Sequence, residues 1–170
     1  MALYKTKGIV LKSRPFEEAG KLVTFFTRDF GKITAIAKGA KRPTSKFGGR
    51  LEPFTLLDLS IASGRNLDIL SQCETINNFR AIRENSKLLK MGMYFLKVIN
   101  KATEERQKNP GLFKLLAVSL MKLSEGEPLD KLERYFDVNF LRVEGLFRKD
   151  IPPDILIGEH LGEDVRPWKI

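Results

Sequence analysis

The apolar pattern of this 170-residue chain changes its period near residue 80. Before that point, short runs with the alternation of β-strands follow one another, and after it apolar residues recur at helical spacing. The strand-like runs are 8–12, 21–27, 32–38, 54–61 and 67–74. Turn-forming residues at 29–31 and 62–66 join the second run to the third and the fourth to the fifth as hairpins. The pattern predicts an α+β chain, with a β domain over residues 1–80 and a helical domain over 81–170.

Five short strands in about 75 residues leave sheet edges that have to be covered. A five-stranded β-barrel of the OB type covers them by closing on itself. A half-open five-stranded sheet fits the same alternation nearly as well. The strand pattern alone therefore leaves both architectures open for the β domain.

Three helices with short connections are predicted after residue 80. Their start signals are Asn85-Ser86, Asn109-Pro110 and Pro128. The third helix is expected to carry its apolar stripe through Phe147, because Pro152-Pro153 is the next signal that prevents continuation. The tail from Asp154 to Ile170 is expected to be irregular or short-helical, with Trp168 docked on the rest of the protein.

Positive charge is concentrated in the N-terminal half. The net charge is +9, and residues 1–80 supply +7 of it, from 14 Lys and Arg against 7 Asp and Glu. The segment 32–50 contains no acidic residue and six basic ones, Lys32, Lys38, Lys41, Arg42, Lys46 and Arg50. Its Gly, Pro and Ser content between 39 and 49 is typical of an exposed loop. A basic loop that leaves a short strand is suited to bind polyphosphate.

Aromatic residues lie in or beside the predicted loops. Phe47 and Phe30 are the candidates for stacking on nucleic-acid bases, since one lies inside the basic segment and the other in a predicted turn. Together with basic side chains on a barrel, such rings are typical of single-strand binding. Most charge runs are solvated surface, so charge alone would not carry this interpretation.

Residues for covalent or metal chemistry are scarce. His160 is the only histidine and Cys73 the only cysteine, so no internal disulfide can form and a reducing compartment is expected. Neither a P-loop nor a dinucleotide-binding glycine pattern is present. We predict no catalytic residue, no cofactor and no metal. Because no run approaches the 18 or so apolar residues of a membrane span, we expect a soluble cytoplasmic protein that does not act at a membrane.

Three segments resemble the N-terminal domain of the RecO family of bacterial recombination and repair mediators. They are GIVLKSRPFEEAGKLV, the hairpin TRDFGK, and AKGAKRPTSKFGGRLEPF. The last of these is similar to the family's pattern K-G-x-R/K-R, S-x-F and L-x-P-F. The resemblance is specific to about residue 80 and extends in layout through the helices to about residue 147.

This resemblance implies an OB-type barrel joined to a helical domain, in a bacterial protein that acts at the nucleoid. It implies binding of single- and double-stranded DNA, annealing of complementary strands, and work with RecR to load RecA onto strands coated by single-strand-binding protein. The family's DNA-contacting segment falls on Lys38, Lys41, Arg42, Lys46 and Arg50, with Lys32 at the end of the matching hairpin.

The chain also departs from the family. Many members hold zinc with cysteine pairs in the helical domain, but no cysteine follows Arg148 here, so zinc is not expected. The family's site for the acidic tail of single-strand-binding protein is not identified by the sequence. Basic residues of the predicted helices could form one, although an ordinary solvated helix face fits them better. They are Lys90, Lys97, Lys101 and Lys114.

Two other interpretations remain open. An RNA-binding OB module would prefer RNA at matched salt by reading the 2′-hydroxyl. A basic structural adaptor would instead dock an acidic protein and bind DNA only weakly.

Overall fold

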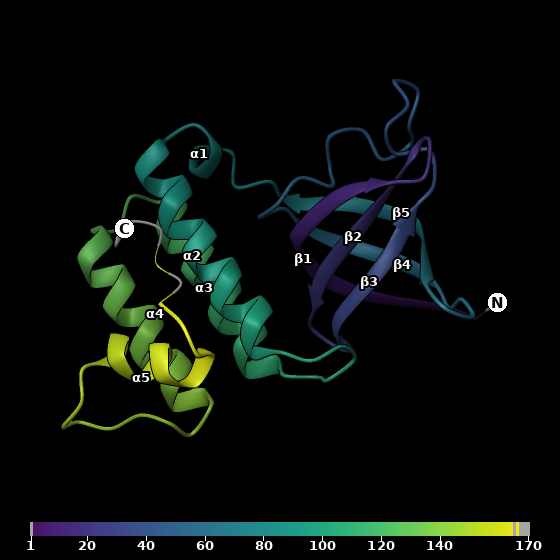
Figure 1. Ribbon diagram of the computed structural model, residues 1–170. Coiled ribbons are helices and arrows are strands. Elements are labelled where there is room, and N and C mark those ends of the chain that lie inside the picture. Colours follow the sequence, from purple (N-terminus) through teal and green to yellow (C-terminus); the bar gives the residue numbers. More distant parts are fainter. Residues whose placement is uncertain (1, 165, 167–170) are drawn as a thin grey trace. The chain divides into compact units, whose positions relative to one another are not determined.

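The computed structural model describes residues 2–164 and 166, which form two compact units (Figure 1). The first unit is Met1–Asn78 with Thr103–Pro110, and the second is Phe79–Ala102 with Gly111–Ile170. The first is built on a sheet and the second on helices, so the α+β class is confirmed.

The first unit is a closed five-stranded barrel. Its strands are β1 (Leu3–Phe16), β2 (Gly20–Thr27), β3 (Gly31–Ala37), β4 (Leu56–Ala62) and β5 (Asp68–Asn77). They pair in the order β1-β2-β3-β5-β4, with β1 returning to β4 (Figure 1). The β3–β5 ladder is parallel and the other four are antiparallel. This closed ring excludes the half-open sheet and is consistent with the OB type.

Strand β1 is longer than the pattern predicted. Its first half pairs with β4 and its second half with β2, and both ladders include Gly8 and Ile9. A register shift lies within the β1–β2 ladder, between Val10 and Lys12. A bulge of this kind bends a strand, which lets one strand serve two edges of a barrel. The first half was missed because Lys5 and Lys7 alternate with Tyr4 and Thr6, which leaves no apolar run to recognise.

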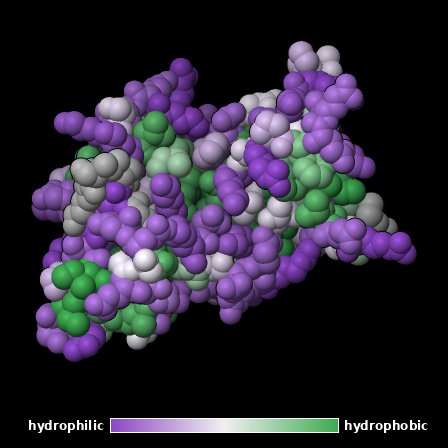
Figure 2. Space-filling model, in the orientation of Figure 1, coloured by the Kyte–Doolittle hydropathy of each residue, from purple (hydrophilic) through white to green (hydrophobic). Residues whose placement is uncertain are grey.

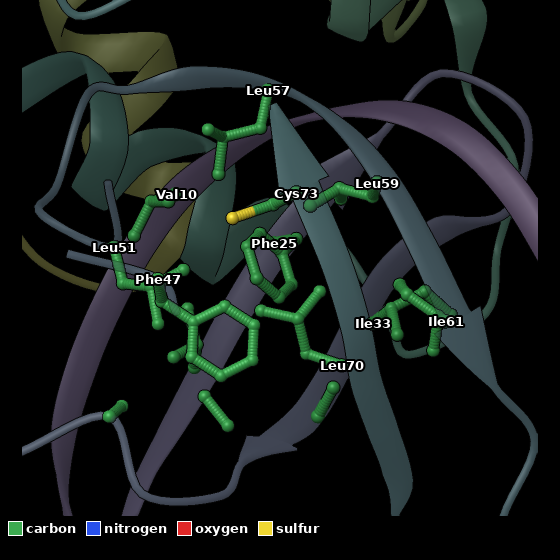
Figure 3. Packing of buried hydrophobic residues seen from close by; sticks show 14 residues of the cluster. Val10, Phe25, Ile33, Phe47, Leu51, Leu57, Leu59, Ile61, Leu70 and Cys73 are labelled. Carbon is green, nitrogen blue, oxygen red and sulfur yellow. The ribbon is translucent and has the colours of Figure 1, made fainter. Parts of the chain in front are cut away.

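The barrel interior is apolar and closely packed. Figure 3 shows Val10, Phe25, Ile33 and Leu70 pointing to a common centre from different strands. Cys73 lies in the same cluster, and burial raises the pKa of its thiol. This confirms the interpretation of Cys73 as a packing residue.

Residues 103–110, which connect the first two predicted helices, belong to the barrel unit. This segment runs beside β3, where the Lys32 ammonium donates to the Thr103 carbonyl at 2.7 Å and the Arg106 N–H donates to the Lys32 carbonyl at 2.8 Å. The Arg106 guanidinium also pairs at 2.7 Å with Asp68, whose side chain is 1 % exposed. Burial opposes ionisation of Asp68, but hydrogen bonds from Tyr4, the Gly64 N–H and Arg106 lower its pKa. The segment therefore covers the part of β3 that lies beyond its short ladder with β5.

Gly31 allows this close approach, and its replacement by alanine is expected to release the segment. Gly31 has φ +71°, and a Cβ there would lie 2.2 Å from the Gln107 carbonyl oxygen. We expect Gly31→Ala to cost about 1–3 kcal/mol and to speed amide hydrogen exchange over residues 103–110. Gly48→Ala is the control, because Gly48 has φ +56° with nothing within 4 Å of the added Cβ. Equal exchange in the two variants would contradict the role of this contact.

The second unit contains five helices within its described residues. They are α1 (Arg80–Arg83), α2 (Ser86–Ala102), α3 (Pro110–Ser124), α4 (Leu129–Val143) and α5 (Pro153–Leu161). Asn85 caps α2 as predicted, since its Oδ1 accepts from the N–H groups of Lys87 and Leu88. No described helix has both the length and the hydropathy needed to cross a bilayer.

The third predicted helix is shorter than expected. α4 ends at Val143, and Gly145 has φ +74°, which is a left-handed conformation that ends a helix. The prediction that the helical stripe continues through Phe147 is therefore wrong. The predicted irregular or short-helical tail contains α5. Trp168 lies outside the described residues.

Aromatic rings and one buried carboxyl group form the interior of the helical unit. The rings of Phe95 and Phe136 stack with centroids 4.3 Å apart. Beside them the Tyr94 hydroxyl donates to the Asp137 carboxylate at 2.5 Å, and Asp137 is only 4 % exposed. Arg166 lies over the Tyr94 ring and forms ion pairs with Glu133, Asp154 and Asp164.

Asp137 is expected to make the stability of this unit depend on pH. Burial raises its pKa from 3.8 to about 7. Between these two pKa values, the folded protein keeps a carboxyl proton that the unfolded chain has released. The stability that protonated Asp137 contributes is therefore fully present below about pH 4 and is lost as pH rises through 7. Asp137→Asn stays neutral, so it is expected to be more stable than the parent above pH 7, by on the order of a few kcal/mol. Urea unfolding at pH 5 and pH 8 measures this, and an unchanged difference between the two proteins would contradict it.

Candidate nucleic-acid interface

The basic segment forms most of a long loop between β3 and β4, residues 38–55, which we call the β3–β4 loop. Apolar side chains fix it to the barrel. Phe47 and Leu51 point into the core beside Val10 and Phe25, as Figure 3 shows, and Ala40 is buried with them. The loop thus contributes residues to the barrel core while its polar side chains stay outside.

Successive turns fix the loop backbone. Hydrogen bonds of 3.0 Å join the Arg42 N–H to the Gly39 carbonyl and the Ser45 N–H to the Arg42 carbonyl. The Lys41 N–H also donates to the Ala19 carbonyl at 3.0 Å, which ties the loop to the β1–β2 turn. A backbone held in this way presents its cations without the entropy cost of ordering a free loop.

Four of the six predicted cations face the solvent. They are Lys38, Lys41, Arg42 and Lys46. Within residues 2–164 and 166, no ion pair neutralises any of them. Figure 2 shows the loop, at the upper right, as a mostly hydrophilic projection. These four side chains can therefore contact phosphates directly.

Arg50 and Lys32 are held by the protein itself. Arg50 is half-buried and donates to the Cys73 carbonyl at 3.2 Å and the Lys46 carbonyl at 3.3 Å, so it anchors the loop to β5. Lys32 is half-buried, burial lowers its pKa, and its ammonium holds the Thr103 carbonyl. These geometries favour positioning roles for both residues.

The two aromatic candidates are not in equivalent positions. Phe47 is 1 % exposed and belongs to the barrel core, so the prediction that it stacks on a base is wrong. Phe30 is 39 % exposed and packs edge-on against Tyr4 at 4.7 Å in the β2–β3 turn. That turn lies at the opposite end of β3 from the loop, about 20 Å away at the usual rise of a strand. Phe30 can contact a base only on a strand that extends along β3.

Two further cations follow Val10, whose N–H donates to the Thr55 carbonyl at the end of the loop, and were missed in the sequence. Lys12 and Arg14 alternate on the outer face of β1 and are exposed. They line a groove of about 240 Å³ with Ser13, Leu22, Thr24 and Thr34. Their signal was the alternation of two basic residues with half-buried Ser13, but it could be used only once β1 was known to extend past its bulge. Glu17 and Glu18 form the neighbouring turn, and their carboxylates would repel phosphates there.

The opposite face of the barrel has mixed charge. A groove of about 290 Å³ there contains Lys5, Lys7 and Arg28 but also Asp58 and Glu74. Lys7 is already paired with Asp58 at 3.3 Å. This face is less suited to a polyanion than the loop side.

Groups for covalent or metal chemistry do not gather around the loop. In the described part of the chain, no cluster of three or more His, Cys, Asp or Glu is placed to hold a metal. Cys73 is buried with a raised thiol pKa, and His160 lies on α5 beside Phe140, with ring centroids 6.3 Å apart. Among the described residues, the loop therefore presents exposed cations rather than groups for covalent or metal chemistry.

Comparison with known families decides which kind of protein carries this surface. The family model described as "Recombination protein O N terminal" matches residues 1–79, and "Recombination protein O C terminal" matches residues 83–147. The chain belongs to the RecO family. The expected resemblance is confirmed over the barrel and over the helices as far as residue 147.

Curated RecO relatives agree with this assignment. The chain is 38 % identical over 144 residues to the DNA repair protein RecO of Bacillus pumilus, covering 85 % of this chain and 56 % of that protein. It is 35 % identical over 145 residues to the DNA repair protein RecO of Bacillus subtilis, covering 85 % and 57 %. The chain therefore spans a little over half the length of these RecO proteins. Repair and recombination are the processes in which the family works.

Proposed function

We propose that this chain binds single- and double-stranded DNA through the β3–β4 loop and the adjoining face of β1, as part of a recombination mediator. The observation that carries the proposal is a set of four exposed cations on a loop fixed by buried Phe47 and Leu51, none of them in an ion pair with another described residue. Lys12 and Arg14 extend this set to six charges. We assign this role to the β domain, residues 1–80, and contacts with protein partners to the helical domain, residues 81–170.

The proposed mechanism is electrostatic and needs no covalent step. Two complementary strands repel each other along their phosphates, and cations that neutralise both strands lower that barrier to pairing. Base pairing then supplies the driving force for annealing. No side chain of the loop is placed as a reader of base edges, so little sequence preference is expected.

The proposed partners follow from the family. We infer that the chain acts on DNA in the bacterial cytoplasm, at the nucleoid, with RecR, and that it helps to load RecA onto strands coated by single-strand-binding protein. Lys90, Lys97 and Lys114 are exposed on α2 and α3 and could receive the acidic tail of the coating protein, whereas Lys101 is paired with Glu163.

Binding across a salt series tests the proposal. If six cations contact single-strand phosphates, log K is expected to fall with log salt at a slope of about −4, at about −0.7 per contact. Oligothymidylate and oligouridylate of equal length are compared at each salt concentration. A strong preference for the RNA would favour the RNA-binding module, and DNA binding too weak to measure would favour the adaptor that docks an acidic protein.

A further inference from the structure

The helical unit has a basic groove of its own on the outer side of α4, which we call the α4 groove. Its volume is about 370 Å³. The residues that line it are Lys131, Arg134, Tyr135, Val138, Asn139, Arg142 and Phe147. Positions 131, 134, 135, 138 and 142 follow the helical repeat, so they form one stripe along the helix. From Lys131 to Arg142 this stripe is about 16 Å long.

The α4 groove carries only positive charge. Lys131, Arg134 and Arg142 are exposed, and no carboxylate of the described residues lines the groove. None of the three takes part in an ion pair within residues 2–164 and 166. The neighbouring Arg148, by contrast, is paired with Asp150 at 2.8 Å. Three cations on one stripe exceed the charge that a single anionic group would need. The stripe is therefore suited to a polyanion.

Two aromatic rings lie among these cations. The Lys122 ammonium is 5.1 Å from the centroid of the half-buried Tyr135 ring. The Arg142 guanidinium lies 4.9 Å from the centroid of the Phe147 ring. Each cation lies over the face of its ring, so a base that stacks there has to displace it, and the displaced charge can then neutralise the phosphate beside that base.

We propose that the α4 groove binds a segment of single-stranded nucleic acid, with phosphates on Lys131, Arg134 and Arg142 and a base against Tyr135 or Phe147. The alternation of flat rings with cations over about 16 Å matches the alternation of bases with phosphates better than it matches an acidic peptide, which lacks a flat group at each charge. The proposal rests on the proposed DNA-binding function and adds a site within the helical unit. With a site in each unit, one chain can hold two strands.

The test compares two charge-matched variants of the full chain. The first is Lys131→Gln with Arg134→Gln and Arg142→Gln, and the control is Lys5→Gln with Arg65→Gln and Lys87→Gln, three exposed cations outside the proposed binding sites. The probe is oligothymidylate of eight nucleotides, and the number bound per chain at low salt is measured by calorimetry. We expect the parent and the control to bind two oligonucleotides per chain, and the α4 variant to bind one.

A second variant separates stacking from charge. Tyr135→Leu keeps the charge and an apolar side chain, so the affinity of the second oligonucleotide is expected to fall about tenfold with an unchanged salt slope. The triple variant should instead lose the second oligonucleotide altogether.

The outcomes distinguish the two proposals. If the parent binds no oligonucleotide, the proposed function fails and the α4 site fails with it. If parent, control and α4 variant all bind one, the barrel site stands and the α4 proposal is overturned. An α4 variant that keeps both oligonucleotides but loses an oligoglutamate peptide would also overturn it, in favour of an acidic protein partner.

Discussion

Replacing Lys41 and Arg42 together with alanine is expected to weaken single-stranded DNA binding about 10- to 30-fold at 0.1 M salt. Both side chains are exposed on the β3–β4 loop and have no ion pair in the described part of the chain. Each lost phosphate contact removes about 0.7 from the salt slope, which should therefore change from about −4 to about −3. Fluorescence anisotropy with oligonucleotides of several sequences measures both quantities, and the loss should be the same for each sequence.

The matched control removes the same charge elsewhere on the barrel. Lys5 and Arg65 are both exposed, on β1 and in the β4–β5 turn, away from the loop. Lys5→Ala with Arg65→Ala is expected to reduce affinity only through the small change in overall charge. If the two double variants lose affinity equally, the interface is not at the β3–β4 loop and net charge alone accounts for binding.

Replacing Phe47 with alanine is expected to destabilise the barrel by about 3–5 kcal/mol. The ring is 1 % exposed and fills the core beside Leu51 and Phe25, so its removal leaves a cavity and frees the loop from its main anchor (Figure 3). Urea unfolding followed by circular dichroism measures the change in the free energy of unfolding.

Phe47→Leu separates the packing role from base stacking. Leucine keeps much of the apolar volume, so this variant should lose less stability and retain DNA affinity wherever it is folded. A loss of affinity of tenfold or more with little loss of stability would restore Phe47 as a stacking residue and contradict its placement in the core.

Much of the fold could be predicted because apolar periodicity reports burial directly. The hairpin turns, the Asn85 cap and the start of α3 at Pro110 depend on neighbouring residues and were found from local signals. Closure of the barrel and the first half of β1 depend on pairing between distant residues, which no local pattern records. The same is true of segment 103–110, whose place beside β3 depends on Arg106 reaching Asp68.

The candidate site was predicted in part for a similar reason. A basic loop can be recognised from composition, but which cations remain available depends on tertiary partners. Arg50 and Lys32 bind backbone carbonyls from distant segments, and Phe47 turns inward to anchor the loop. Conversely, Lys12 and Arg14 come near the loop only because β1 pairs with its end, where the Val10 N–H donates to the Thr55 carbonyl at 3.0 Å. The α4 groove escaped notice because a charged stripe on a helix is ordinarily a solvated face.

The measurement that tests the central claim most directly is annealing of two complementary fluorescent oligonucleotides across a salt series. It is run with the parent chain, the Lys41/Arg42 alanine variant and the Lys5/Arg65 control. We predict that the parent and the control accelerate annealing, that the acceleration fades as salt rises, and that the loop variant loses most of it. A folded parent chain that gives no acceleration at any salt concentration, or a loop variant as active as the control, would contradict the claim.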